Sequence, residues 1–323
     1  MNKNSDKAHQ SFSVYQKQKE RIVTKDETIK GISIRKTIRP LLVFMLRIQR
    51  LFTGLKIEII SKPDFKRDKP VIYAVSHIGK WDLEIIHEVL RNHFWVVAAD
   101  FLHMYGHIDL PFMWATGCIF VNEYSKSDRR YTKKMMTKVL KQGDNVLIFP
   151  EGEWNLTENE IIRDTSFGTV DSALRTGVSI VPIAMEQYQN LFVINVGEDL
   201  CLDEISGKYT DKEFSELDME LDEERRIIRE IELEANRILR DALATLKWEI
   251  WERKGIERRK DIPSNYWYEF IKLRGSEWRG FDLKDQIVNG CFPPEKKEWI
   301  RVQQTMAKLN PKWWSCCWLD RDI

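Results

Sequence analysis

The sequence contains little cysteine, glycine or proline, and it lacks a long uninterrupted apolar run. Five cysteines among 323 residues are too few, and odd in number, for a disulfide scaffold, which favours a reducing compartment. With 15 glycines and 10 prolines, the chain is neither collagen-like nor of low complexity. No apolar run reaches the ~18 residues that a membrane-spanning helix needs. The polar N-terminus is unlike a secretory signal peptide.

The chain also lacks a strong net charge. Its 51 lysines and arginines nearly balance 50 aspartates and glutamates, which leaves a formal charge of +1. This balance argues against a partner nucleic acid, because proteins dedicated to nucleic-acid binding are usually strongly basic. Hydrophobic residues at 43% exclude wholesale disorder, and 323 residues are ample for one large domain or two small ones.

The near-neutral total conceals a basic and partly apolar N-terminal region. Residues 1–70 carry 17 Lys or Arg against 7 Asp or Glu. Within them, residues 38–60 combine bulky aliphatic and aromatic side chains with four interspersed basic residues. This combination predicts an amphipathic helix that lies in the bilayer interface and is attracted by anionic lipid. A helix packed on the core, with solvated basic side chains, is the alternative.

From residue 71 onward, short apolar runs alternate with helical patterns. The runs, read as strands, are 71–75, 95–99, 118–121, 146–149, 180–184 and 192–196. Residues 83–90 and 129–140 read as helices between them, and residues 222–254 form a long amphipathic helix. Continuous apolar strands that alternate with helices indicate an α/β fold with a mainly parallel sheet flanked by helices.

Four parts are therefore expected along the chain. Residues 1–36 read as a polar tail, flexible or a frayed helix, and residues 37–62 as the amphipathic membrane-interface segment. Residues 63–255 form the main α/β domain, including the long helix. Residues 256–323 are a helical, Trp-rich extension, since residues 247–323 hold 8 of the 12 tryptophans. This extension could be a lid, a docking surface or additional core.

The first motif with catalytic chemistry lies at a strand-to-helix turn. His77 and Asp82 are five residues apart, directly after the strand at 71–75 and at the start of the helix at 83–90. In this geometry the carboxylate can reach one imidazole nitrogen while the other faces a substrate, which makes a general base. The carboxyl end of a strand is also where α/β sheets place their sites. A structural histidine with satisfied hydrogen bonds is the alternative.

A second motif follows the strand at 146–149. It is the sequence Phe149, Pro150, Glu151 and Gly152. A carboxylate at the carboxyl end of a strand can accept hydrogen bonds from a hydroxylated substrate, and glycine allows close approach of the backbone. An ordinary turn is the alternative.

A basic cluster comes after the Gly-led strand at 117–121. Lys126, Arg129 and Arg130 are its members, and such a cluster can hold a phosphate group. A solvated helix start is the alternative. A further run, Val-Pro-Ile at 181–183, lies in a later apolar strand.

These motifs occur in an order that resembles a known family. His-x4-Asp, Gly-x-Ile-Phe-Val, Phe-Pro-Glu-Gly and Val-Pro-Ile, spread over roughly residues 70–200, are similar to the glycerolipid acyltransferases, the family of bacterial 1-acylglycerol-3-phosphate acyltransferases. The resemblance implies an enzyme of phospholipid synthesis. It implies transfer of a fatty acyl group from a thioester, acyl-CoA or acyl-carrier protein, to the hydroxyl of a lysophospholipid, above all 1-acylglycerol-3-phosphate.

The resemblance also implies roles for particular residues. His77 is expected to be the general base and Asp82 the group that orients it. The segment from Phe149 to Gly152, with Glu151 foremost, is expected to help form the acceptor site. No metal and no cofactor besides the thioester co-substrate is expected. The family implies a peripheral enzyme at the cytoplasmic face of the cell membrane, in agreement with the N-terminal amphipathic segment.

The chain departs from the family pattern at two of these motifs. Glu123 stands where the family usually has an arginine that holds the acceptor phosphate, although the basic cluster follows closely. After Phe-Pro-Glu-Gly the family usually has Thr-Arg, and this chain has Glu153 and Trp154. Three alternatives stay open: a different hydroxyl or amine acceptor, a thioester or lipid hydrolase, and a non-enzymatic membrane-associated interaction protein.

Two further patterns are read as uninvolved in catalysis. His103 and His107 have the spacing of two metal ligands, but Gly106 and Pro111 interrupt any helix there, so a polar loop is favoured. The vicinal pair at 316–317 is read as two small hydrophobic cysteines near the Trp-rich end.

Overall fold

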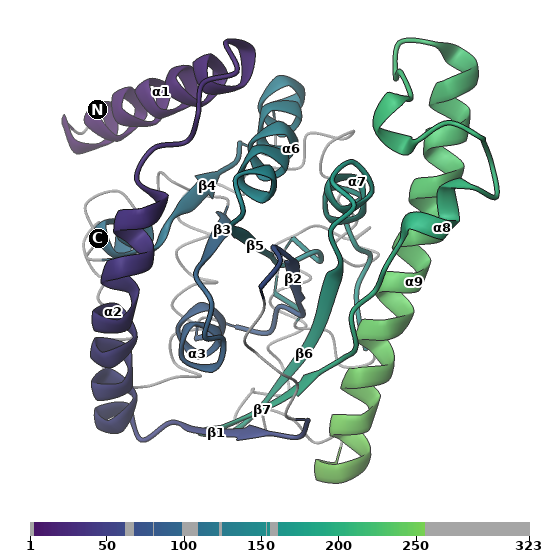
Figure 1. Cartoon of the computed structure of the whole chain (residues 1–323). Coiled ribbons are helices and arrows are strands. Elements are labelled where there is room, and N and C mark those ends of the chain that lie inside the picture. The colour runs from purple at the N-terminus through teal and green to yellow at the C-terminus, as the bar shows by residue number, and fades with distance from the viewer. Residues whose placement is uncertain are drawn as a thin grey trace, which may run out of the picture.

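A single mixed sheet forms the centre of the described structure. The computed structural model describes residues 3–61, 68–79, 81–98, 109–122, 125–152, 154–155 and 161–255. The strands within these ranges are β1 (Lys56–Ile59), β2 (Ile72–Val75), β3 (Phe94–Ala98), β4 (Cys118–Phe120), β5 (Asn145–Ile148), β6 (Ile180–Tyr188) and β7 (Leu191–Val196). They form a seven-stranded sheet in the order β1-β7-β6-β2-β5-β3-β4 (Figure 1).

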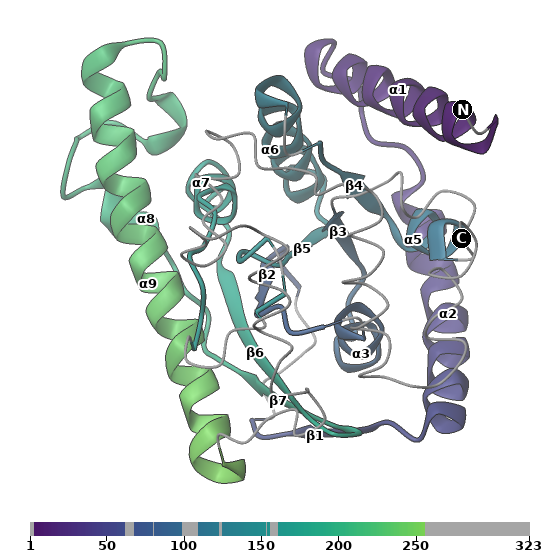
Figure 2. The ribbon, with the colours of Figure 1, turned by 180° about the vertical axis from the view of Figure 1, so that it is seen from behind.

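Helices cover the sheet on both sides. In chain order they are α1 (Lys3–Thr24), α2 (Ile32–Thr53), α3 (Asp82–Val89), α5 (Asp109–Thr116), α6 (Lys126–Lys141), α7 (Gly168–Leu174), α8 (Asp203–Ser206) and α9 (Asp222–Lys254), with a 3-10 turn at Phe214–Glu216. Figures 1 and 2 show α9 along one side of the molecule and α2 along the other.

The sheet is parallel at every strand pair except one. β2 lies between β5 and β6 and is parallel to both, with Ile72 opposite Val146 and Ile180. Only β6 and β7 run antiparallel, because two residues join them and a parallel pair needs a long crossover. The α/β class with a mainly parallel sheet is therefore confirmed. The Trp-rich extension at 256–323 lies outside the described residues.

The two faces of the sheet bury alternate residues of each strand. In β2, Tyr73 and Val75 pack toward α3, whereas Ile72 and Ala74 pack in the core that includes α6, α7 and α9. All four are buried, so the strand needs apolar side chains on both faces. This explains why β2 appears in the sequence as a continuous apolar run without polar alternation.

The first helix corrects the prediction of a polar tail over residues 1–36. Helix α1 packs on α6 and on the edge strand β4 (Figure 2). Lys19 is buried, forms an ion pair with Asp128 and donates to the carbonyl of Phe120 at 2.8 Å. The hydroxyl of Tyr15 accepts the backbone N–H of Phe120 at 2.9 Å. These partners lie more than 100 residues away in the chain. The sequence of residues 1–36 by itself therefore resembles a solvated segment.

The predicted amphipathic segment, 37–62, is only partly helical. Helix α2 begins earlier, at Ile32, and ends at Thr53. Gly54 follows with φ 69°, a left-handed conformation that favours glycine and terminates the helix. Residues 56–59, which we expected to continue the helix, form the edge strand β1 beside β7. The bulky aliphatic residues there are compatible with both the helical and the strand period, and pairing with β7 makes the segment a strand.

Helix α2 is fixed to α3 by buried polar contacts. Arg39 contacts Nδ1 of His87 at 2.8 Å and donates to the carbonyl of Leu90 at 2.8 Å. Burial lowers the pKa of Arg39 to about 10, so it stays protonated at neutral pH. Burial, aided by Arg39, holds the pKa of His87 well below its ordinary value, so this imidazole is neutral and accepts the bond. Nearer the C-terminal end of α2, Arg50 pairs with Glu88 at 2.9 Å.

Candidate active site

The His77 and Asp82 side chains are in direct contact. Nδ1 of His77 lies 2.8 Å from Oδ2 of Asp82. His77 follows β2 at the carboxyl end of the parallel strands, and Asp82 is the first residue of α3. The Asp82 side chain is 1% exposed, whereas that of His77 is 19% exposed. A buried carboxylate that fixes one nitrogen of a partly exposed imidazole leaves Nε2 as the nitrogen for proton transfer.

The turn between β2 and α3 is built around the Asp82 carboxylate. Oδ2 accepts the backbone N–H of Ile78 at 2.6 Å and that of Gly79 at 2.9 Å, in addition to the contact with His77. One oxygen therefore accepts from three donors in the turn. With Asp82 five residues after His77, α3 begins at a carboxylate that points back toward these donors, which explains the spacing of the motif. The histidine ring is therefore oriented by the same oxygen that shapes its backbone.

The Phe-Pro-Glu-Gly segment lies beside this pair. The ring of Phe149 stacks on that of His77, with centroids 4.0 Å apart and an interplanar angle of 17°. Glu151 is fully buried, and its Oε1 accepts the backbone N–H of His77 at 2.9 Å. Gly152 adopts φ 74°, which closes the turn through its N–H bond to the carbonyl of Phe149. The two motifs are therefore neighbours in the structure.

The environment of Glu151 differs from that of an exposed substrate ligand. Its second oxygen, Oε2, accepts the backbone N–H of Arg163 at 3.0 Å, so both oxygens hold main-chain donors. A carboxylate in this position fixes the two loops that border His77. The expectation that Phe149, Pro150, Glu151 and Gly152 contact the acceptor stays a prediction.

Sequence reasoning gave no site role to three residues that contact His77 or Glu151. The ring of Trp154 meets that of His77 edge to face at a centroid distance of 6.0 Å. Asn155 donates its backbone N–H to the carbonyl of His77 at 2.6 Å. Arg163 contributes the N–H that binds Glu151. Trp154 follows the Phe-Pro-Glu-Gly segment and was open to detection, whereas the other two act through main-chain atoms and leave no sequence signal.

The basic cluster lies at the same edge of the sheet but two strands away. Lys126, Arg129 and Arg130 occupy the first turns of α6, which follows β4. Since β3 separates β4 from β5, and neighbouring strands are ~4.8 Å apart, the strand before α6 is ~10 Å from the strand before Phe149. Arg130 pairs with exposed Glu220 at 3.7 Å. A role in phosphate binding stays a prediction for all three.

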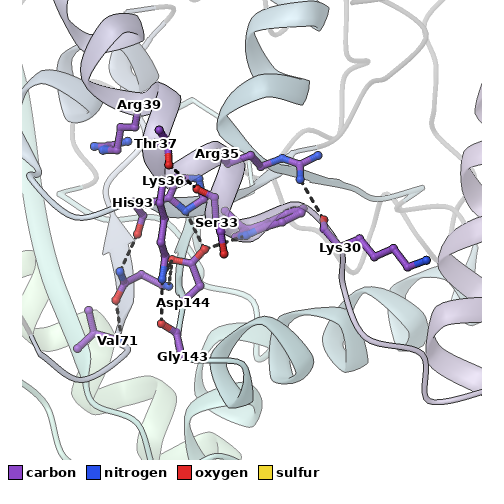
Figure 3. A network of polar contacts seen from close by, with 12 residues as sticks. Lys30, Ser33, Arg35, Lys36, Thr37, Arg39, Val71, His93, Gly143 and Asp144 are labelled. Carbon is purple, nitrogen blue, oxygen red and sulfur yellow. Dashed lines mark hydrogen bonds and ion pairs between the residues drawn. The ribbon is translucent and has the colours of Figure 1, made fainter.

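A second histidine–carboxylate pair occurs at the opposite edge of the sheet (Figure 3). Nδ1 of His93 lies 2.7 Å from Oδ2 of Asp144, which also accepts Nε1 of Trp95 at 3.1 Å. Lys36 of α2 approaches Asp144 and Gly143 (Figure 3). Both members of the pair directly precede strands, at the amino edge, and their side chains are at most 3% exposed. This pair anchors the start of α2 to the sheet and has no access for a substrate.

The metal hypothesis concerns residues that the structure does not cover. His103 and His107 lie outside the described residues. Within the described ranges, no group of three or more His, Cys, Asp or Glu side chains is arranged to hold a metal ion.

The fold and the site together define a class of protein. An imidazole oriented by a buried carboxylate, at the carboxyl edge of a mainly parallel sheet, is the arrangement of an α/β enzyme that uses a general base. Residues 56–186, which include His77, Asp82 and the Phe-Pro-Glu-Gly segment, match the family model described as Acyltransferase. The match agrees with the family resemblance predicted from the order of the motifs.

One similar protein has a curated function. The 1-acyl-sn-glycerol-3-phosphate acyltransferase of Borreliella burgdorferi is 26% identical over 151 residues, which cover 47% of this chain. The aligned part spans 59% of the length of that relative. A crystal structure of the 1-acyl-sn-glycerophosphate acyltransferase PlsC from Thermotoga maritima matches 76% of this chain and 96% of its own, at 11% identity and a TM-score of 0.46.

Proposed function

We propose that this protein transfers a fatty acyl group from a thioester to a lipid hydroxyl in phospholipid synthesis. The observation that carries the proposal is the His77–Asp82 contact at 2.8 Å, within the segment that matches the Acyltransferase model. This pair differs from the buried His93–Asp144 pair because its imidazole is partly exposed, as proton transfer from a substrate requires.

The mechanism follows from the geometry of the pair. Nε2 of His77 removes the proton of the acceptor hydroxyl as its oxygen attacks the thioester carbonyl, and Asp82 stabilises the imidazolium that forms. The tetrahedral intermediate then collapses: the carbon–sulfur bond breaks, and the imidazolium returns its proton to the leaving thiolate. The products are the ester and the free thiol, and His77 is again neutral.

The acceptor that we favour is 1-acylglycerol-3-phosphate. The relative from Borreliella burgdorferi carries this acceptor in its name. Lys126, Arg129 and Arg130 supply positive charge at the N-terminal turns of α6, where backbone N–H groups also favour an anion. Acyl-CoA or acyl-carrier protein is the donor. A different hydroxyl or amine acceptor is the second candidate, because Glu123 replaces the family's usual arginine.

Acyl transfer by the purified full chain tests this proposal. The donors would be labelled acyl-CoA and acyl-carrier protein loaded with a labelled acyl group. The vesicles would consist of phosphatidylethanolamine and phosphatidylglycerol, and they would contain either 1-acylglycerol-3-phosphate or an uncharged monoacylglycerol as the acceptor. We expect label in the diacyl product of the phosphate-bearing acceptor. Transfer only to the uncharged lipid would overturn the acceptor assignment. Free fatty acid without acylated lipid would indicate a hydrolase, and no turnover of either donor would contradict the proposal.

We further propose that α2 binds the cytoplasmic membrane surface. Apolar side chains on one side of α2 are 39% to 73% exposed: Leu41, Phe44, Met45, Ile48, Leu51 and Phe52. They lie opposite Arg39, Leu46 and Thr53, which are buried against the domain. Exposed apolar bulk on a helix in a basic region is typical of interfacial binding. In the described part of the chain, no helix has the length and apolar character to span a bilayer.

Replacing Phe44 and Leu51 with serine is expected to weaken vesicle binding at least about 10-fold, because each large apolar side chain contributes up to about 1.5–3 kcal/mol when buried. Cosedimentation with anionic vesicles measures the change. The matched control is Met219→Ser with Leu221→Ser, two apolar residues of similar exposure (45% and 53%) that lie beside the start of α9. Equal loss of binding in both double variants, or no loss in the first, would contradict a specific role for α2.

A further inference from the structure

Residues 163–166, in the loop that precedes α7, are hydrogen-bonded to the segment beside His77. Ser166 donates its backbone N–H to the carbonyl of Pro150 at 2.8 Å, and Arg163 donates its own to Glu151 at 3.0 Å. The other oxygen of Glu151 accepts the N–H of His77 at 2.9 Å. Glu151 is fully buried between these donors, so its carboxylate links residues 163–166 to the main chain of His77.

Helix α9 holds this loop from outside. Asn236 and Thr165 form a reciprocal pair: the Thr165 hydroxyl donates to Oδ1 of Asn236 at 3.0 Å, and Nδ2 of Asn236 donates to the Thr165 carbonyl at 3.0 Å. One turn further along α9, Arg240 donates to the carbonyl of Ile162 at 3.2 Å. Residues four apart lie on the same side of a helix, so both side chains face the loop.

These contacts are separate from those that fix α9 itself. Ile231, Ala235 and Leu239 are fully buried in the main core, together with the rest of the apolar stripe of α9. The apolar stripe is sufficient to seat the helix on the sheet. The loss of the Asn236 hydrogen bonds is therefore expected to free the loop and leave the helix in place. Helix α9 also lies outside residues 56–186, the part matched by the family model.

We propose that Asn236, supported by Arg240, is a positioning residue that sets the geometry of His77 through Thr165 and Glu151. Its effect on turnover rests on the proposed acyltransferase function. Asn236 touches neither reacting group. It holds Thr165 and the neighbouring residues in the position in which Glu151 accepts the backbone N–H of His77. Small displacements of a catalytic group are costly, since a misplacement of about 1 Å can reduce the rate ~10²-fold.

The test uses Asn236→Leu, which removes both hydrogen bonds at nearly constant volume. We expect kcat to fall about 10- to 100-fold, while KM for the thioester and for the lipid changes less than about 3-fold. Amide hydrogen exchange should become faster at His77 and Arg163 and stay unchanged in β2. Thr165→Val breaks the hydroxyl contact from the loop side and should act in the same direction. Arg237→Leu, at the adjacent exposed position of α9, is the control and should change neither readout.

The outcomes separate this proposal from the proposed function. Unchanged exchange at His77 and Arg163 in both Asn236→Leu and Thr165→Val would overturn it, and so would faster exchange with an unchanged kcat. If the wild-type protein performs no acyl transfer, that result counts against the enzymatic function alone. Amide exchange then decides: faster exchange at the two amides supports the coupling of α9 to His77, and wild-type exchange refutes it. Should Asn236→Leu fail to fold, Thr165→Val carries the same test.

Discussion

Replacement of His77 by alanine is expected to lower kcat for acyl transfer by about 10²- to 10⁴-fold, the usual contribution of a general base. The change removes Nε2, the nitrogen that takes the proton of the acceptor hydroxyl. The side chain is 19% exposed and makes its closest contacts with Asp82 and Phe149, so the protein should remain folded. Steady-state kinetics on vesicles, together with thermal unfolding, measure both effects.

The matched control for this variant is His93→Ala. His93 also contacts an aspartate, at 2.7 Å, but at the amino edge of the sheet and almost wholly buried. Its removal leaves Asp144 without one of its partners, and we expect a loss of about 1–3 kcal/mol in the free energy of unfolding with little change in kcat of the folded protein. The hypothesis of a general base fails if His77→Ala retains more than about a tenth of the wild-type kcat, since a base contributes ~10²-fold or more.

Asp82→Asn is expected to give the second large loss, about 10²- to 10⁴-fold in kcat. The asparagine keeps an oxygen that can accept from His77, Ile78 and Gly79, so the turn can retain its shape. It removes the negative charge that stabilises the imidazolium. Oδ1 of Asp82 is buried with no hydrogen-bond partner among the described residues, which leaves a place for the amide nitrogen without a broken bond.

Two comparisons sharpen this prediction. The double variant His77→Ala, Asp82→Asn should be no slower than His77→Ala alone, because residues that act as one unit have non-additive effects. Asp144→Asn, the equivalent change in the second pair, should lower the melting temperature and leave kcat of the folded protein nearly unchanged. A result in which the two single losses multiply would show that Asp82 acts independently of His77, contrary to the mechanism.

The sequence alone determined the features that depend on neighbours in the chain. The strand β2 and the helix α3 follow from a continuous apolar run and a helical pattern. The contact between His77 and Asp82 needs only the five residues of one turn, so the spacing predicted it. The resemblance to the acyltransferases assigned the Phe-Pro-Glu-Gly segment to the same site as this pair.

Only the tertiary structure decided what depends on partners far away in the chain. The Glu151 carboxylate meets the N–H of His77 across 74 residues and that of Arg163 across 12, which gives it two main-chain partners that its sequence position does not reveal. The same holds for the bond between Asn236 and Thr165, 71 residues apart. Residue types and their spacing determine the local conformation of a segment. The hydrogen-bond partner of a buried polar group depends instead on how separate elements pack together.

Helix boundaries and burial at the N-terminus show the same division. The alternation of charge and apolar bulk gave α2 its amphipathic character, but pairing with β7 turned residues 56–59 into a strand. Lys19 is a solvated residue by composition and a buried one in the fold, because Asp128 on α6 neutralises it. Local sequence therefore determined the elements and the candidate base, and long-range packing determined which polar groups position it.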